Sequence, residues 1–135
     1  MVTGQIALDG DVVKIGYSAL DGTAVENAFD GNLDTLIKSR AANPLELDLE
    51  FPKTRKMEGL TVKVGGETVK LSVDVYEEKN SIPIHFEKQV GEVPGYKNIT
   101  IDFTPIEAVK RIHIAIQDVY APDPSIVHVC EVSFK

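Results

Sequence analysis

Tryptophan is absent from this chain of 135 residues, and cysteine occurs only once, at Cys130. A lone cysteine cannot close an internal disulfide, so the cysteine count leaves the redox compartment open. We expect Cys130 to be a small buried hydrophobe in the last strand rather than a nucleophile. Basic residues are also scarce, because 14 Lys and Arg stand against 21 Asp and Glu, for a net charge of −7. This balance argues against nucleic acid and anionic membranes as main partners, since both attract basic surfaces.

Signatures of membrane insertion, metal chemistry and catalysis are missing as well. No apolar run approaches the length of a membrane span, and no charged-then-apolar leader opens the chain. The three histidines, His85, His113 and His128, fall on separate predicted strands without zinc-ligand spacing. We find no nucleophile elbow, no glycine-rich phosphate loop and no acid pair that spacing singles out. We therefore predict a non-catalytic protein.

Period-two alternation of apolar and polar residues dominates the chain, as expected for half-buried strands. The length suits one domain, covering residues 1–135, and the 43% hydrophobic content is that of a globular protein. Gly65 and Gly66 predict a tight hairpin, Pro83 predicts an edge strand, and the basic stretch 53–56 is expected to be a solvated loop. The one helical suggestion is a short turn at 25–29. The fold class is therefore all-β, a sandwich or jelly roll, with strands expected at 45–51, 60–64, 69–75, 82–86, 99–103, 112–116 and about 126–134.

The segment 24–35 concentrates oxygen-bearing side chains on one short loop. Asp30, Asn32, Asp34 and Thr35 lie within six positions, and Gly31 lets the chain turn where a Cβ would clash. Such a loop can present side-chain and backbone oxygens to a hard cation such as calcium. The same residues are also ordinary turn formers, so a plain capped turn is an alternative interpretation.

Three segments, in order, resemble the coagulation-factor type C (discoidin) domains and the related family 32 carbohydrate-binding modules. Segment 24–35 is similar to their Ala-Asp-Gly-Asn-x-x-Thr signature, 44–49 to their hydrophobic–acidic strand, and 125–132 to their closing Ser-Ile-x-x-x-x-Glu-Val strand. The resemblance implies a galactose-binding-domain-like β-sandwich jelly roll of about eight strands. The usual Trp after the Thr is replaced by Leu36 and Ile37, the Gly-x-Pro turn by 50–52, and the paired cysteines are absent. The chain is identified as a divergent member.

The resemblance also implies a structural calcium. Members of the family hold this ion with the loop and with a Glu from the last strand. The matching positions are Asp30 and Thr35 by side chain, Asn27 and Asn32 by backbone carbonyl, and Glu131. The alternative is that Asp30 caps a turn and Glu131 is a solvated strand residue, while Asp34 serves as a capping or outer group.

A sugar site is implied at the loops of one end of the sandwich, where an aromatic ring stacks on the sugar and planar polar groups grip its hydroxyls. Tyr120 is the stacking candidate, with Arg40 and Asp118 as hydrogen-bonding partners. Alternatively, Tyr120 covers the sandwich edge, and Arg40 pairs with a surface carboxylate in an interaction of little energy.

These implications favour a monomeric, extracellular or cell-surface carbohydrate-binding module that tethers a parent enzyme or surface protein to a glycan or polysaccharide. Another domain of that parent is a further candidate partner. The alternative function is a protein-interaction or spacer sandwich that keeps the calcium loop and has lost the sugar site. The low aromatic content, 7% with no Trp, counts against sugar binding.

Overall fold

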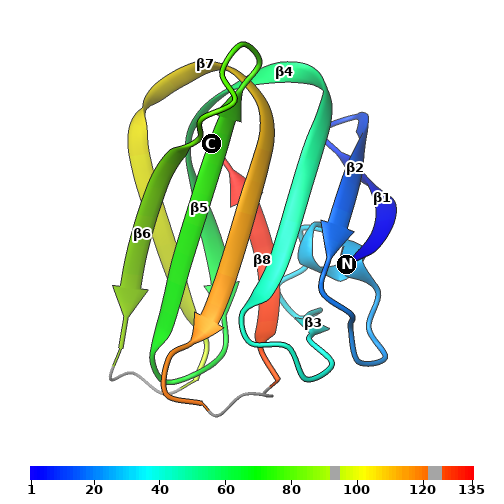
Figure 1. The fold of residues 1–135 in the computed structure, drawn as a ribbon. Coiled ribbons are helices and arrows are strands. Elements are labelled where there is room, and N and C mark those ends of the chain that lie inside the picture. Colours follow the sequence, from blue (N-terminus) through cyan, green and yellow to red (C-terminus); the bar gives the residue numbers. More distant parts are fainter. Residues whose placement is uncertain (92–94, 122–125) are drawn as a thin grey trace.

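The computed structural model describes residues 1–91, 95–121 and 126–135 as an antiparallel sheet of eight strands (Figure 1). Hydrogen bonding connects the strands in the order β1-β2-β4-β7-β5-β6, and β8 adds to β4 and carries the short β3. The strands are β1 (Val2–Leu8), β2 (Asp11–Tyr17), β3 (Ile37–Lys38), β4 (Leu45–Val64), β5 (Val69–Glu77), β6 (Ile84–Val90), β7 (Lys97–Asp118) and β8 (His128–Phe134). This arrangement confirms the predicted all-β jelly roll.

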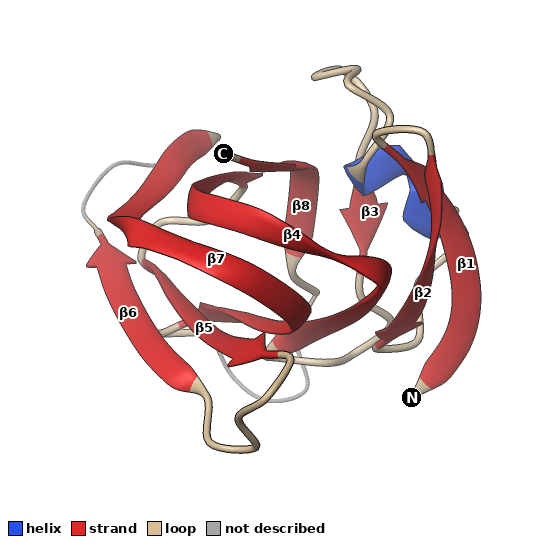
Figure 2. Cartoon of the chain, turned by 90° about the horizontal axis from the view of Figure 1, so that it is seen from above, coloured by secondary structure: helices blue, strands red, loops and turns tan. Residues whose placement is uncertain are grey.

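Two long strands, β4 and β7, bend at mid-length and so take part in both layers of the sandwich (Figure 2). The first half of β4 pairs antiparallel with the second half of β7, for example Leu47 with Ile114. The second half of β4 pairs with the first half of β7, for example Leu60 with Ile101. The register shifts between Glu50 and Gly59, which marks bulges at the bend. Stretch 53–56, predicted to be a loop, therefore lies within β4, and that prediction was wrong.

The core lies between the two layers and is built by the alternating residues that the sequence pattern singled out. Leu47, Ile114 and Val73 form one row across β4, β7 and β5, and each is fully buried. Cys130 is buried in β8, as expected. Glycines 65 and 66 lie in the β4–β5 connection, as expected for a turn, but the predicted hairpin was wrong, because β7 lies between β4 and β5 in the strand order.

Several predicted boundaries shift, and three strands were missed. β6 lies at the sheet edge as expected but begins at Ile84, after Pro83, and β8 begins at His128 rather than at 126. The strands β1, β2 and β3 were not predicted. The predicted turn near 25–29 is the short 3₁₀ helix η1 (Val25–Ala28). No helix in the described parts of the chain is long and apolar enough to cross a membrane.

Candidate functional site

Loop 24–36, which contains η1, is folded by its own short polar side chains. The Asp30 carboxylate accepts hydrogen bonds from the Asn32 amide (2.9 Å) and the Thr35 hydroxyl (2.7 Å). The Asn32 side chain accepts from the Asp34 amide at 2.9 Å. Gly31 has a φ of +73°, the left-handed conformation that favours glycine. As a result, the Asp30 carboxylate and two carbonyl oxygens of the loop lie around the Thr35 hydroxyl.

The Thr35 hydroxyl has more acceptors than it can use. Its Oγ1 is 2.7 Å from Asp30 Oδ2, 3.0 Å from the Asn32 carbonyl and 3.2 Å from the Asn27 carbonyl. A hydroxyl has only one proton to donate, so it can satisfy one of these three oxygens. The Asn32 carbonyl also accepts from the Thr35 main-chain amide at 3.3 Å. The Asn27 carbonyl and the remaining lone pairs of the other two oxygens are the kind of donors that a hard cation takes.

Glu131 reaches the same loop from β8, 100 residues further along the chain. Its Oε2 accepts a hydrogen bond from the Gly31 amide at 3.2 Å. Its Oε1 is buried and has no hydrogen-bond partner among the described residues. Burial, with a smaller contribution from the nearby Asp30 carboxylate, raises the pKa of Glu131 to about 6. The Thr35 hydroxyl, followed by the Asn32 amide, holds the pKa of Asp30 below its usual value.

All five residues predicted to hold calcium therefore lie together. An oxygen-ligated cation would fit here. It could use the unpaired Glu131 oxygen, the Asp30 carboxylate and the carbonyls of Asn27 and Asn32. In the described ranges, no three His, Cys, Asp or Glu side chains group as a metal site, so backbone carbonyls would have to supply the remaining ligands. Asn27 itself is fixed by a hydrogen bond from its side-chain amide to the Leu36 carbonyl, at 3.2 Å.

The predicted sugar-binding residues lie on neighbouring loops and do not share one hollow. Tyr120 is 80% exposed and borders a hollow of about 230 Å³ with Thr68, Gln89 and Gly91. The Asp118 main chain is clamped to Asn43, with its carbonyl accepting from the Asn43 amide at 2.8 Å and its amide donating back at 2.9 Å. This clamp joins the end of β7 to the loop after β3.

Arg40, on the loop after β3, is exposed, and its amide donates to the Ala19 carbonyl at 2.8 Å. Its guanidinium makes no ion pair within residues 1–91, 95–121 and 126–135. Neither Arg40 nor Asp118 lines the hollow beside Tyr120. The three-residue ligand set thus stays a prediction, and part of the predicted loop, 122–125, lies outside the described residues.

Comparison with protein-family models and with curated proteins finds no match for this sequence. Solved structures do match its fold. A pectin-binding carbohydrate-binding module has a TM-score of 0.68 and 19% identity, over 90% of this chain and 88% of that one. The family 32 carbohydrate-binding module of AlyQ, in complex with 4,5-unsaturated mannuronic acid, has a TM-score of 0.69 and 17% identity, over 98% of each chain. Chitosan-binding module 1 of a Paenibacillus sp. IK-5 chitosanase/glucanase has a TM-score of 0.64 and 16% identity, also over 98% of each.

The chain has the fold of the family 32 carbohydrate-binding modules. This jelly-roll architecture is the one that the resemblance of the three sequence segments implied. Identities of this size establish the fold alone.

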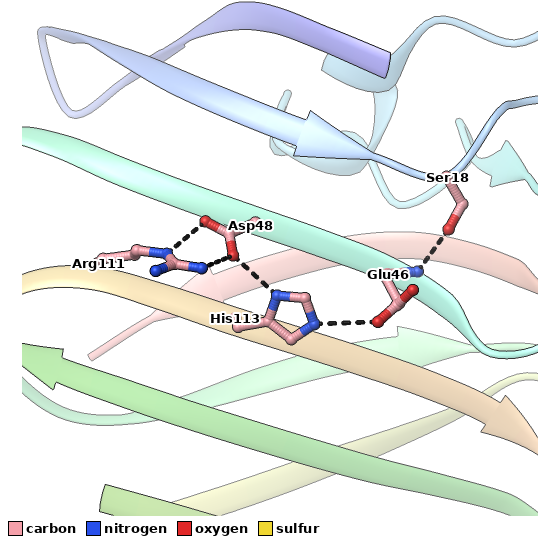
Figure 3. Close-up of polar contacts among 5 residues, drawn as sticks. All are labelled: Ser18, Glu46, Asp48, Arg111 and His113. Carbon is pink, nitrogen blue, oxygen red and sulfur yellow. Dashed lines mark hydrogen bonds and ion pairs between the residues drawn. The ribbon is translucent and has the colours of Figure 1, made fainter. Parts of the chain in front are cut away.

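Sequence reasoning missed a polar cluster on the outer face of this family 32 fold (Figure 3). Arg111 on β7 donates to both oxygens of Asp48 on β4, at 2.8 and 2.7 Å. His113 contacts Asp48 through Nδ1 at 2.8 Å and Glu46 through Nε2 at 3.2 Å. Partial burial opposes it, but hydrogen bonds from Arg111 and His113 hold the pKa of Asp48 below its usual value. Because these polar groups pair with one another, the cluster ties β4 to β7.

Sequence reasoning also missed the residues that form the hollow beside Tyr120. The hollow is formed by Thr68, which precedes β5, by Gln89 on β6 and by Gly91, which follows it. These residues are far apart in the sequence, and only strand pairing places them side by side. No local pattern in the sequence could have identified them.

Proposed function

We infer that this protein is a non-catalytic carbohydrate-binding module with a structural calcium site. The observation that carries this proposal is the nearly end-to-end match to solved binding modules, combined with a strongly exposed tyrosine at the loop end. Those modules are described as binding pectin, as holding an unsaturated mannuronic acid, and as binding chitosan. A glycan or polysaccharide is accordingly the proposed ligand class.

Tyr120 is the proposed stacking surface. The C–H face of a pyranose ring is apolar and packs on an aromatic plane, while hydroxyls around the ring need directional partners. Thr68 and Gln89 supply a hydroxyl and an amide at the same hollow. Arg40 and Asp118 stand on adjoining loops as further partners. Because an open site of this kind buries little area, we expect affinities of about micromolar to millimolar, increased by multivalency.

The tethering role is supported by the context in which similar domains occur. The match to a truncated AlyQ, which carries its family 32 module and an alginate lyase domain, covers 98% of this chain but only 33% of that one. The match to a Ruminococcus gnavus GH29 fucosidase likewise covers 93% of this chain and 25% of that one. We propose that this module likewise holds a parent enzyme or surface protein at a glycan, outside the cell or on its surface.

The Tyr120→Ala variant is expected to lose at least about tenfold in glycan affinity, about 1.4 kcal/mol, because the stacking surface is removed. The measurement is a glycan array in calcium that includes pectin, alginate and chitosan fragments, followed by calorimetric titration. Tyr120→Phe keeps the ring and should bind like wild type. Ile82→Ala removes another strongly exposed side chain (73%), on the β5–β6 loop, and should also bind normally.

Unchanged binding by Tyr120→Ala would place the sugar site elsewhere. A blank array from folded wild-type protein would favour the alternative function, a protein-interaction or spacer domain. One observation supports that alternative. A largely apolar hollow of about 450 Å³ lies beside Phe86 and Phe103, whose rings stack 4.5 Å apart, and Ile84 and Ile106 help to line it.

Calcium would link loop 24–35 to β8 through Asp30 and Glu131, so its removal should lower stability. We expect the melting temperature of wild type to rise in calcium relative to chelator, because a ligand of the folded state stabilises it. Asp30→Ala should abolish this rise. Asp34→Ala is the matched control, since only the backbone amide of Asp34 holds the loop, and it should keep the rise. A wild type that melts identically in calcium and chelator would contradict the calcium assignment.

A further inference from the structure

Tyr96 is a second exposed tyrosine at the loop end of the module. Its side chain is 54% exposed. The Lys63 ammonium lies over the ring, 5.9 Å from its centroid. The residue stands just before β7, and Figure 1 shows that β4, β6 and β7 all end or begin at this end of the sandwich. Nothing in the sequence pattern marked Tyr96 as a site residue.

The ring of Tyr96 rests against Gly65, and only a glycine leaves room for it. A Cβ on Gly65 would lie 3.0 Å from Tyr96 Cε1, 3.4 Å from Cδ1 and 3.3 Å from the Cβ of His128. The glycine is itself fixed, because its amide donates to the His128 carbonyl at 3.0 Å. Tyr96 is therefore held in one place while half of its surface stays open, which reduces the entropy lost on binding.

Tyr120 lies at the other end of the same β4–β5 connection, residues 65–68, next to the start of β5. It shares its hollow with Thr68, and the neighbouring Val119 amide donates to the Thr68 carbonyl at 2.9 Å. The connection between the two tyrosines is stiffened by Lys97, whose ammonium donates to the carbonyls of Gly66 (2.5 Å) and Glu67 (2.6 Å). Two aromatic rings thus flank a fixed turn at the proposed sugar-binding end.

We propose that Tyr96 is a second stacking platform and that the module binds a segment of a glycan chain rather than a single terminal sugar. The inference rests on the proposed function of Tyr120. Because the backbone of the β4–β5 connection separates the two tyrosines, one pyranose ring cannot stack on both. A chain that crosses this connection can place one ring on Tyr120 and a later ring on Tyr96. The Lys63 ammonium beside Tyr96 then donates to hydroxyls of that later ring.

The test is the dependence of affinity on chain length. Oligogalacturonates, oligomannuronates and chito-oligosaccharides of one to six units are titrated into wild type and variants in calcium. Wild type should bind the long members of its preferred series about tenfold more tightly than the short members. Tyr96→Ala should bind short members like wild type and lose that gain, whereas Tyr120→Ala should weaken both.

A pair of glycine variants tests the contact between Gly65 and the Tyr96 ring without changing the tyrosine itself. Gly65→Ala should displace Tyr96 and lose most of the gain with chain length. Gly4→Ala is matched to it, because its Cβ would meet the Tyr17 ring at an ordinary 3.7 Å, and it should behave like wild type. Tyr96→Phe should keep the gain. Because Tyr96 is half exposed, Tyr96→Ala should melt close to wild type, which separates lost binding from lost folding.

A gain with chain length that survives in Tyr96→Ala overturns this inference and leaves the proposed function standing. The same conclusion follows if wild type binds one unit as tightly as six. If folded wild type binds none of the three series and the array is blank, both this inference and the proposed function fail.

Discussion

Replacing Gly59 by alanine is expected to lower the free energy of unfolding by about 2–5 kcal/mol. Gly59 lies in the bend of β4 and has a φ of +153°, a conformation that residues with a side chain rarely adopt. A Cβ there would lie 2.5 Å from the Ile101 carbonyl oxygen and 3.2 Å from the Cα of Asp102. Both atoms belong to the β7 backbone, which cannot move aside as a flexible side chain could. Chemical denaturation of wild type and variant measures the loss.

Gly16→Ala is the control for this experiment. Gly16 has no positive φ, and its nearest neighbour, the terminal methyl group of Met1, would lie 3.6 Å from the new Cβ. Its stability should change by less than about 1 kcal/mol, since no contact is tight. If Gly59→Ala unfolded like Gly16→Ala, the β7 backbone would have to adjust freely at the bend, and the bulged pairing of β4 with β7 would not constrain the fold.

The strands predicted with the best boundaries include those, such as β5, that are buried on one face along their whole length. In β5 every second residue from Val69 to Val75 is buried, so the pattern has a period of two. In β1 only Ile6 is buried, and Val12 on β2 is 60% exposed, because this hairpin lies at the sheet edge. β1 therefore has no alternating pattern to detect. In β2 the buried Val13 and Ile15 do alternate with exposed residues, but the stretch is short and the exposed Val12 obscures it.

The bend of β4 shows a second limit of periodicity. Pro52 and the basic residues after it resemble a loop, yet Arg55 and Met57 still pair with β7. Each bulge adds an unpaired residue and resets the alternation, so the apolar pattern on either side of it falls out of phase. A single long strand is then indistinguishable in sequence from two strands and a loop.

The proposed calcium site could be predicted from the sequence more fully than the proposed sugar site, for a related reason. Four of the five proposed calcium ligands lie within one loop, and the fifth, Glu131, was identified by its place in a family motif. The hollow beside Tyr120 and the seat of Tyr96 depend on which strand ends meet, and Gly65 matters only because Tyr96 lies over it. Contacts of this kind follow from register, which the sequence pattern alone does not fix.

Replacing Glu131 by glutamine is expected to have opposite effects with and without calcium. At pH 8 in chelator, the variant should be more stable than wild type, because it removes a partly buried negative charge whose Oε1 has no partner. In calcium the order should reverse. A ligand present at one hundred times its Kd stabilises the folded state by about 2.7 kcal/mol, and the variant should lose most of that gain. Melting curves of both proteins in calcium and in chelator give the comparison.

The pH dependence in chelator tests the same carboxyl without the metal. Burial raises the pKa of Glu131 from 4.5 to about 6 in the folded state, so the folded protein binds this proton more tightly than the unfolded chain. The free energy of unfolding should therefore fall as pH rises from about 4.5 to about 6 and should level off above that range. The pKa of Asp30 is lowered from 3.8, so its own contribution is lost only at more acidic pH, outside this window. Glu131→Gln should show no such fall. A variant that keeps the full slope would mean that another group titrates there and that the Glu131 carboxyl is not the charge that folding buries.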